Sequence, residues 1–130
     1  MKNVALNLFR ITTLVVFIQL LLGGLVTFEF LGVLPHIVLG FIILALAVAI
    51  VIAEFTAEPE IKPARMMSIG LLVLVLIQIM LGYATLDSGS AIIAWVHLLN
   101  SLLIFGLLVS ATVLLSFWSR GLGVPGRTKD

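Results

Sequence analysis

The sequence predicts an all-α fold, an integral membrane four-helix bundle made of two tandem two-helix repeats. Of its 130 residues, 62% are hydrophobic and only 10% are charged, and the mean hydropathy is +1.35. A soluble domain of this size has too little interior for so much apolar surface, so lipid must be the solvent. A helix crosses the hydrocarbon core with about 20 apolar residues. Four stretches meet this need, 9–30, 35–54, 66–86 and 91–118, within one transmembrane domain over residues 1–130.

The same pattern of residues occurs twice along the chain. Each copy has a Gln-x-x-x-Gly motif in its first span and one histidine near the start of its second span. The residues are Gln19, Gly23 and His36 in the first copy and Gln78, Gly82 and His97 in the second. The glutamines are 59 residues apart (78 minus 19) and the histidines 61 apart (97 minus 36). This spacing indicates a tandem duplication, with one repeat at about 9–54 and the other at about 66–118.

The three connections between the spans have recognisable boundaries. The first ends at Pro35, which suits the first turn of a helix because an N–H would have no partner there. The linker over 56–65 is polar, contains two prolines and charges of both signs, and divides the repeats. The last connection is the turn over 87–90, in which Ser90 is expected to cap the fourth helix.

The basic residues predict the orientation in the membrane. All seven lie before or at the start of the first span, between the second and third, or after the fourth: Lys2, Arg10, Lys62, Arg65, Arg120, Arg127 and Lys129. The positive-inside rule then places both termini in the cytoplasm. Both repeats share one orientation, so we expect His36 and His97 in the outer half of the bilayer. A net charge of +1 gives no reason to expect nucleic acid as a partner.

The two histidines are the strongest candidates for chemistry. A histidine within hydrocarbon is costly and normally faces the bundle interior. Because His36 and His97 occupy matched positions, they suggest paired axial ligands of one heme held between facing helices. The simpler alternative is that each makes an interhelical hydrogen bond. The chain has no cysteine, which excludes thioether attachment, so such a heme would be bound non-covalently.

A small residue follows each histidine and each glutamine by four positions, one helical turn away on the same face. These residues are Gly40 and Ser101 after the histidines, and Gly23 and Gly82 after the glutamines. They either make room for a flat ring or allow close packing of membrane helices. Gln19 and Gln78 either bridge helices or lie near the heme, and Asn100 is a weaker candidate for a polar contact.

Other chemistries lack the residues they need. A zinc site requires three or four protein ligands, whereas the chain has only two histidines and no cysteine. Glu29, Glu54 and Asp87 are predicted at the ends of spans. We therefore expect neither a catalytic triad nor the membrane-embedded carboxylate of a proton-coupled exporter.

The order of a Gln-x-x-x-Gly motif and then a histidine, repeated once, resembles the heme A synthase family. Its members consist of two fused four-helix halves, and this chain resembles one half over about residues 15–115, most closely at 78–82 and 97–99. The resemblance implies that His36 and His97 are heme ligands in a half-size protein of a prokaryotic cell membrane. The family has a glutamate three residues before the second-helix histidine and an arginine after it, where this chain has Val33 and Ile37. The resemblance therefore implies the fold and the heme site, and the two departures leave the synthase activity as an alternative.

We thus expect a membrane b-type cytochrome with one non-covalent heme b, ligated by His36 and His97. Two imidazoles fill both axial positions, which favours electron transfer over the binding of an external ligand. The expected partners are the lipid bilayer, a quinol or another cytochrome as redox partner, and a second copy in a homodimer. One alternative is a minimal heme A synthase-type oxidoreductase. The other is a cofactor-free four-span transporter or assembly subunit whose histidines only bridge helices.

Overall fold

The structure, a computed structural model, describes residues 2–58 and 60–121. Within these residues the fold is all-helical and has no strand, as predicted. The four helices are α1 (Lys2–Thr27), α2 (Leu34–Thr56), α3 (Lys62–Ser88) and α4 (Ala91–Ser119). Each is long and apolar enough to span a membrane, so the chain is a multi-pass membrane protein. Arg127 and Lys129, which contributed to the predicted orientation, lie outside the described residues.

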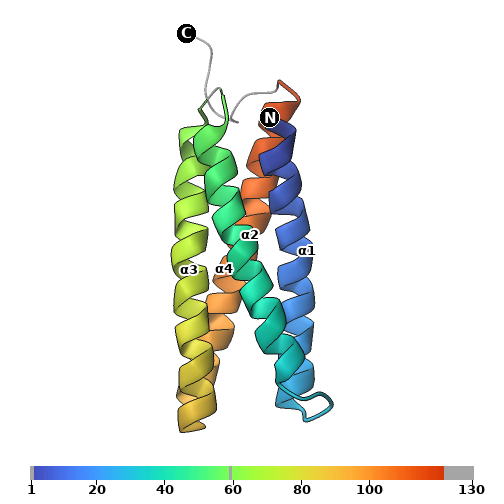
Figure 1. Cartoon of the computed structure of the whole chain (residues 1–130), viewed down its shortest axis with the longest axis vertical. Helices are drawn as coiled ribbons and strands as arrows, with labels where there is room; N and C mark the ends of the chain where they lie inside the picture. Colours follow the sequence, from blue (N-terminus) through green and yellow to red (C-terminus); the bar gives the residue numbers. More distant parts are fainter. Residues whose placement is uncertain (1, 59, 122–130) are drawn as a thin grey trace.

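The helices run alternately up and down around a closed ring (Figure 1). Neighbours in the ring are α1 with α2, α2 with α3, α3 with α4, and α4 with α1. The described parts of the diagonal pairs, α1 with α3 and α2 with α4, are not in contact. The start of α1 and the end of α4 lie at one end of the bundle, here called the terminal end. The α1–α2 and α3–α4 connections lie at the other, here called the histidine end.

Three helix boundaries differ from the predicted spans. The first helix begins at Lys2 instead of residue 9, because the turn before Phe9 is amphipathic and buries Ala5 and Leu6. It ends at Thr27 instead of residue 30, and Glu29 then takes a left-handed conformation with φ 61°. The third helix begins at Lys62, four residues earlier than predicted, because a proline in the first turn is compatible with a helix. The linker between the repeats is correspondingly shorter.

The predicted caps at the histidine end are present. Ser90 is the N-cap of α4, and its hydroxyl accepts a hydrogen bond from the backbone N–H of Ile93 at 3.5 Å. Pro35 lies in the first turn of α2. Gly89 ends α3 with φ 62°, where a glycine avoids the steric cost that other residues carry.

The buried positions repeat with the same offsets as the motif. In α1 and α3 they match at 59 residues: Ala5 with Ala64, Phe9 with Ser68, Thr12 with Leu71, and Val16 with Val75. In α2 and α4 they match at 61 residues: Ile43 with Ile104, Ala47 with Leu108, Ile50 with Ala111, and Glu54 with Leu115. The two repeats therefore contribute equivalent faces to one core, which confirms the predicted repeat architecture.

This core occupies only the terminal half of the bundle. In the described chain, no residue of α1 beyond Val16 or of α3 beyond Val75 is buried. On the other two helices, Asn100 is the only buried described residue nearer to the histidine end than Ile43 and Ile104. The α1–α2 pair and the α3–α4 pair also diverge toward the histidine end in Figure 1. The chain thus packs tightly at the terminal end and leaves its histidines and glutamines in a looser half.

Replacing the fully buried Leu108 with alanine should strongly destabilise the bundle. Deleting a buried leucine side chain loses packing and leaves a cavity, which costs about 2–5 kcal/mol of unfolding free energy. Leu103→Ala on the same helix is the matched control, because Leu103 is 62% exposed and faces lipid. The measurement is helix unfolding by circular dichroism in mixed micelles of rising denaturing-detergent content. Equal losses in the two variants would contradict the assigned core.

Candidate functional site

The side chains of the two histidines come together in the interior of the bundle, although the backbones of their helices, α2 and α4, are not in contact. His36 lies in the first turn of α2 and His97 in the second turn of α4. Their ring centroids are 6.3 Å apart, and the ring planes are inclined at 66°. The up-and-down arrangement places both at the histidine end, as the duplication requires. Each repeat therefore contributes one imidazole to a shared site.

Each imidazole packs on the glycine of the preceding helix. A Cβ atom on Gly23 would lie 3.2 Å from His36 Cε1, and one on Gly82 would lie 3.3 Å from His97 Cε1. The sequence left open whether these small residues make room for a flat ring or for a neighbouring helix. In the structure, the group nearest to each glycine is the histidine ring of the same repeat. The glycines thus fix how closely each imidazole approaches its helix pair.

In the second repeat, Gln78 is the centre of a hydrogen-bond network between α3 and α4. Its amide nitrogen donates to Ser101 Oγ and lies 3.2 Å from His97 Nε2. Its amide oxygen accepts from Asn100 Nδ2 at 2.7 Å, and Asn100 also donates to Leu74 O at 3.0 Å. Ser101 in turn donates to His97 O at 2.9 Å. The network holds His97 from both its ring and its carbonyl.

The first repeat has a simpler arrangement. Gln19 Nε2 donates to His36 O at 2.8 Å and so bridges α1 and α2. Gly40 stands where the second repeat has Ser101, and a Cβ there would lie 3.4 Å from Gln19 Nε2. Leu39 occupies the place of Asn100. The first repeat therefore lacks two of the polar side chains that enclose Gln78.

The network determines the tautomer of His97. Gln78 Oε1 already accepts from Asn100, so its N–H groups face Ser101 and His97. His97 Nε2 is then the acceptor, and the ring proton lies on Nδ1. The lone pair of Nε2 is therefore engaged with Gln78, and a metal ion could bind this nitrogen only in place of that hydrogen bond.

Three buried polar atoms at this site have no hydrogen-bond partner among the described residues: His36 Nδ1, His97 Nδ1 and Gln19 Oε1. An unsatisfied buried polar group costs about 1–3 kcal/mol, so a cluster of three needs an explanation. The described residues also place no carboxylate within ion-pair distance of either imidazole. Glu29 and Asp87, at the same end, are exposed. The site is therefore uncharged, polar and incompletely satisfied by the chain itself.

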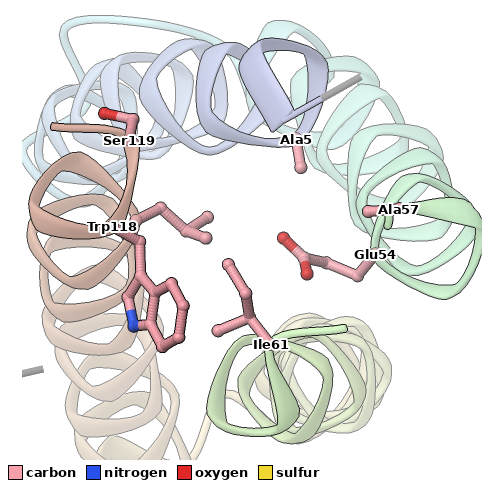
Figure 2. Close-up of a pocket in the computed structure, with 7 residues that line it drawn as sticks. Ala5, Glu54, Ala57, Ile61, Trp118 and Ser119 are labelled. Atoms are coloured by element: carbon pink, nitrogen blue, oxygen red, sulfur yellow. The ribbon is translucent and has the colours of Figure 1, made fainter. Parts of the chain in front are cut away.

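A second polar feature lies at the terminal end. Glu54 is in the last turn of α2, as expected, but it is buried inside the bundle with only 3% of its surface exposed. Its carboxyl group points into a cavity of about 20 Å³ beside Ile61, Leu115 and Trp118 (Figure 2). Glu54 Oε1 has no hydrogen-bond partner in the described part of the chain. Hydropathy alone missed this burial, although the repeat aligns Glu54 with the buried Leu115.

Comparisons with known protein families, curated sequences and solved structures give no match to this chain. The resemblance to the heme A synthase family therefore rests on the repeated motif and its spacing.

Replacing Gln78 with methionine should destabilise the protein more than the same change at the equivalent Gln19. Interhelical hydrogen bonds in membranes contribute about 0.6 kcal/mol each. Gln78→Met loses side-chain contacts to His97, Ser101 and Asn100, so we expect a loss of about 2 kcal/mol, against about 0.6 kcal/mol for Gln19→Met. The measurement is the same detergent-unfolding curve. A larger loss for Gln19→Met would show that the network is not the stronger of the two.

Proposed function

We propose that this protein is a membrane cytochrome that holds one non-covalent b-type heme between His36 and His97 and transfers electrons. The proposal rests on the two imidazoles, which come from separate repeats and reach the same interior point. When bound, the heme would supply reversible one-electron chemistry. The protein would supply the axial nitrogens, a low-polarity environment and a fixed orientation.

The distance between the two rings is the observation that carries the proposal. An imidazole nitrogen binds a metal ion at about 2 Å and lies about 1 Å from the centre of its ring, so two imidazoles on opposite sides of one ion have ring centres about 6 Å apart. The observed centroid separation is 6.3 Å. No group of three or more His, Asp or Glu side chains within residues 2–58 and 60–121 is arranged to hold a metal ion. A donor set of two histidines fits a metal whose remaining ligands come from a macrocycle.

The surroundings of the histidines are consistent with a bound ring. On α2 and α4 the packed core ends at Ile43 and Ile104, about two helical turns from the histidines. Asn100 is the one described buried residue nearer to the histidine end. The imidazoles of His36 and His97 pack against the backbone at Gly23 and Gly82, so the position of each ring depends on the preceding helix. His97 Nε2 is the unprotonated ring nitrogen in its hydrogen-bond network, and a metal ion bound there would replace the hydrogen bond from Gln78.

Two alternatives remain as functions to test. A heme A synthase-type oxidoreductase would need a group to stabilise developing charge, and Val33 and Ile37 provide none where the family has an acid and a base. A cofactor-free transporter could use the buried Glu54, but 18 residues separate it from His36 along α2 (54 minus 36). At 1.5 Å per residue, this places them about 27 Å apart, too far to act as one site.

Alanine at either histidine should remove the low-spin bis-imidazole spectrum. We expect purified wild-type protein from heme-replete membranes to show a Soret band and split α/β bands when reduced. His36→Ala and His97→Ala each leave one axial bond, so each should lose the low-spin features and retain less heme. The measurement is the absorption spectrum with pyridine hemochrome analysis, which separates heme B from heme A.

If the purified wild-type protein is colourless, the cofactor-free transporter is favoured. If cells that make heme O but have no other heme A synthase produce heme A when they express this chain, the enzyme is favoured. An unchanged low-spin spectrum in either variant would exclude that histidine as a ligand.

Alanine at Gly23 should weaken heme binding, whereas alanine at the adjacent Gly24 should not. The new Cβ at position 23 would lie 3.2 Å from His36 Cε1 and push the ring, while one at position 24 meets nothing within 4 Å. Changes around a metal ligand typically lower affinity about tenfold or more. Both changes add the same methyl group to the same helix, so the ratio of heme affinities isolates the ring contact. Equal affinities in the two variants would contradict the role of Gly23.

A further inference from the structure

Arg10 is a charged residue within a membrane span, and neither the core nor the histidine site uses it. The membrane-spanning part of α1 is Val4–Thr27, which starts six residues before Arg10. At 1.5 Å per residue, Arg10 lies about 9 Å past the start of the span. Its side chain is exposed on the surface of the bundle, which is the surface that lipid covers. Arginine in such a position normally has a polar or charged partner.

The chain gives Arg10 only a weak partner. Arg10 Nη2 donates to Ser116 Oγ on α4 at 3.5 Å. Within residues 2–58 and 60–121 the one ion pair joins Arg65 to Glu60, so no carboxylate there neutralises Arg10. Ser116 donates its own hydrogen to Thr112 O at 2.7 Å, which leaves its lone pairs toward the guanidinium. Arg10 is thus held at the edge of α4, and no carboxylate of the described residues compensates its charge.

A hollow lies on α4 at this edge. It has a volume of about 130 Å³ and is lined by Thr112, Val113, Ser116, Phe117 and Arg120. We call it the α4 hollow. Arg120 provides a second guanidinium one turn beyond Ser116, and no acidic residue is among the lining residues. Val113 and Phe117 provide apolar surface. On the side away from the terminal end, Thr13 and Thr112 link α1 to α4 through hydroxyl oxygens 3.5 Å apart.

We propose that the α4 hollow binds the phosphate of one anionic phospholipid, between Arg10 and Arg120. A phospholipid places its phosphate at the membrane surface and its acyl chains alongside the helices. Arg120 lines the hollow, and Arg10 contacts the lining residue Ser116, so two guanidinium groups near the end of the bundle are placed to bind that phosphate. Val113 and Phe117 provide apolar surface for the start of an acyl chain. Basic pockets between membrane helices at this level bind such head groups in other proteins. A lipid phosphate would also supply the counter-charge that Arg10 lacks.

The test is native mass spectrometry of the purified full-length protein in a neutral detergent, titrated with phosphatidylglycerol or phosphatidylcholine. Arg10→Gln and Arg120→Gln each remove one proposed contact. Lys62→Gln is the matched control, because it removes one charge from the same end of the bundle, whereas Lys62 neither lines the hollow nor hydrogen-bonds to a residue that does. Inorganic phosphate serves as a competitor that carries the same charge without acyl chains. Helix content and unfolding curves establish that each variant is folded.

We expect one phosphatidylglycerol to bind more tightly than phosphatidylcholine. Each arginine variant should weaken that binding about fivefold, the effect of one basic residue near an anionic surface. Lys62→Gln should leave it unchanged. An equal loss for Lys62→Gln would overturn the site in favour of diffuse charge attraction. Equal binding of both lipids, or displacement by inorganic phosphate at the lipid's own concentration, would also overturn it. Arg120 is the C-cap residue of α4, outside the helix interior, so we expect Arg120→Gln to fold. If Arg10→Gln does not fold, Arg120→Gln alone tests the site.

Discussion

Polar side chains within membrane helices must find partners inside the protein, and this constraint organises the histidine half of the bundle. The hydrocarbon region offers no water to compensate a buried donor or acceptor. Gln19, Gln78 and Asn100 accordingly face the interior and join helices within each repeat. The histidines follow the same rule, but their Nδ1 atoms have no partner in the described chain. Gln19 Oε1 also lacks a partner there, so the amides of the second repeat are satisfied and those of the first are only partly so.

The two repeats carry the same motif but enclose it differently. Asn100 and Ser101 tie Gln78 into a network in the second repeat, where the first repeat has Leu39 and Gly40. His97 is therefore held more firmly than His36, and its tautomer is determined by its neighbours. The second helix pair is therefore joined by more side-chain hydrogen bonds than the first. For the proposed cytochrome, this gives two axial ligands in unequal surroundings, which affects redox potential through the hydrogen bonding of each ligand.

Stability and binding are divided between the two ends of the bundle. Buried apolar residues at equivalent positions of both repeats pack at the terminal end, from Val16 and Ile43 outward. Because interiors of proteins are close-packed, this end is the rigid part from which the helices extend. The histidine end carries His36, His97 and the two glutamines and has little buried apolar surface among the described residues.

The sequence by itself determined the fold class, the four spans, the duplication and the pairing of His36 with His97. These follow from hydropathy and from residue spacing, which depend only on local helix geometry and on the thickness of a bilayer. Helix ends were less predictable, because the first turn of α1 is amphipathic and is kept helical by burial of Ala5 and Leu6. Only the tertiary structure decided what touches each small residue, since Gly23 and Gly82 meet imidazoles on other helices. It also decided the burial of Glu54 and the exposure of Arg10, because both depend on which neighbouring helix faces each turn.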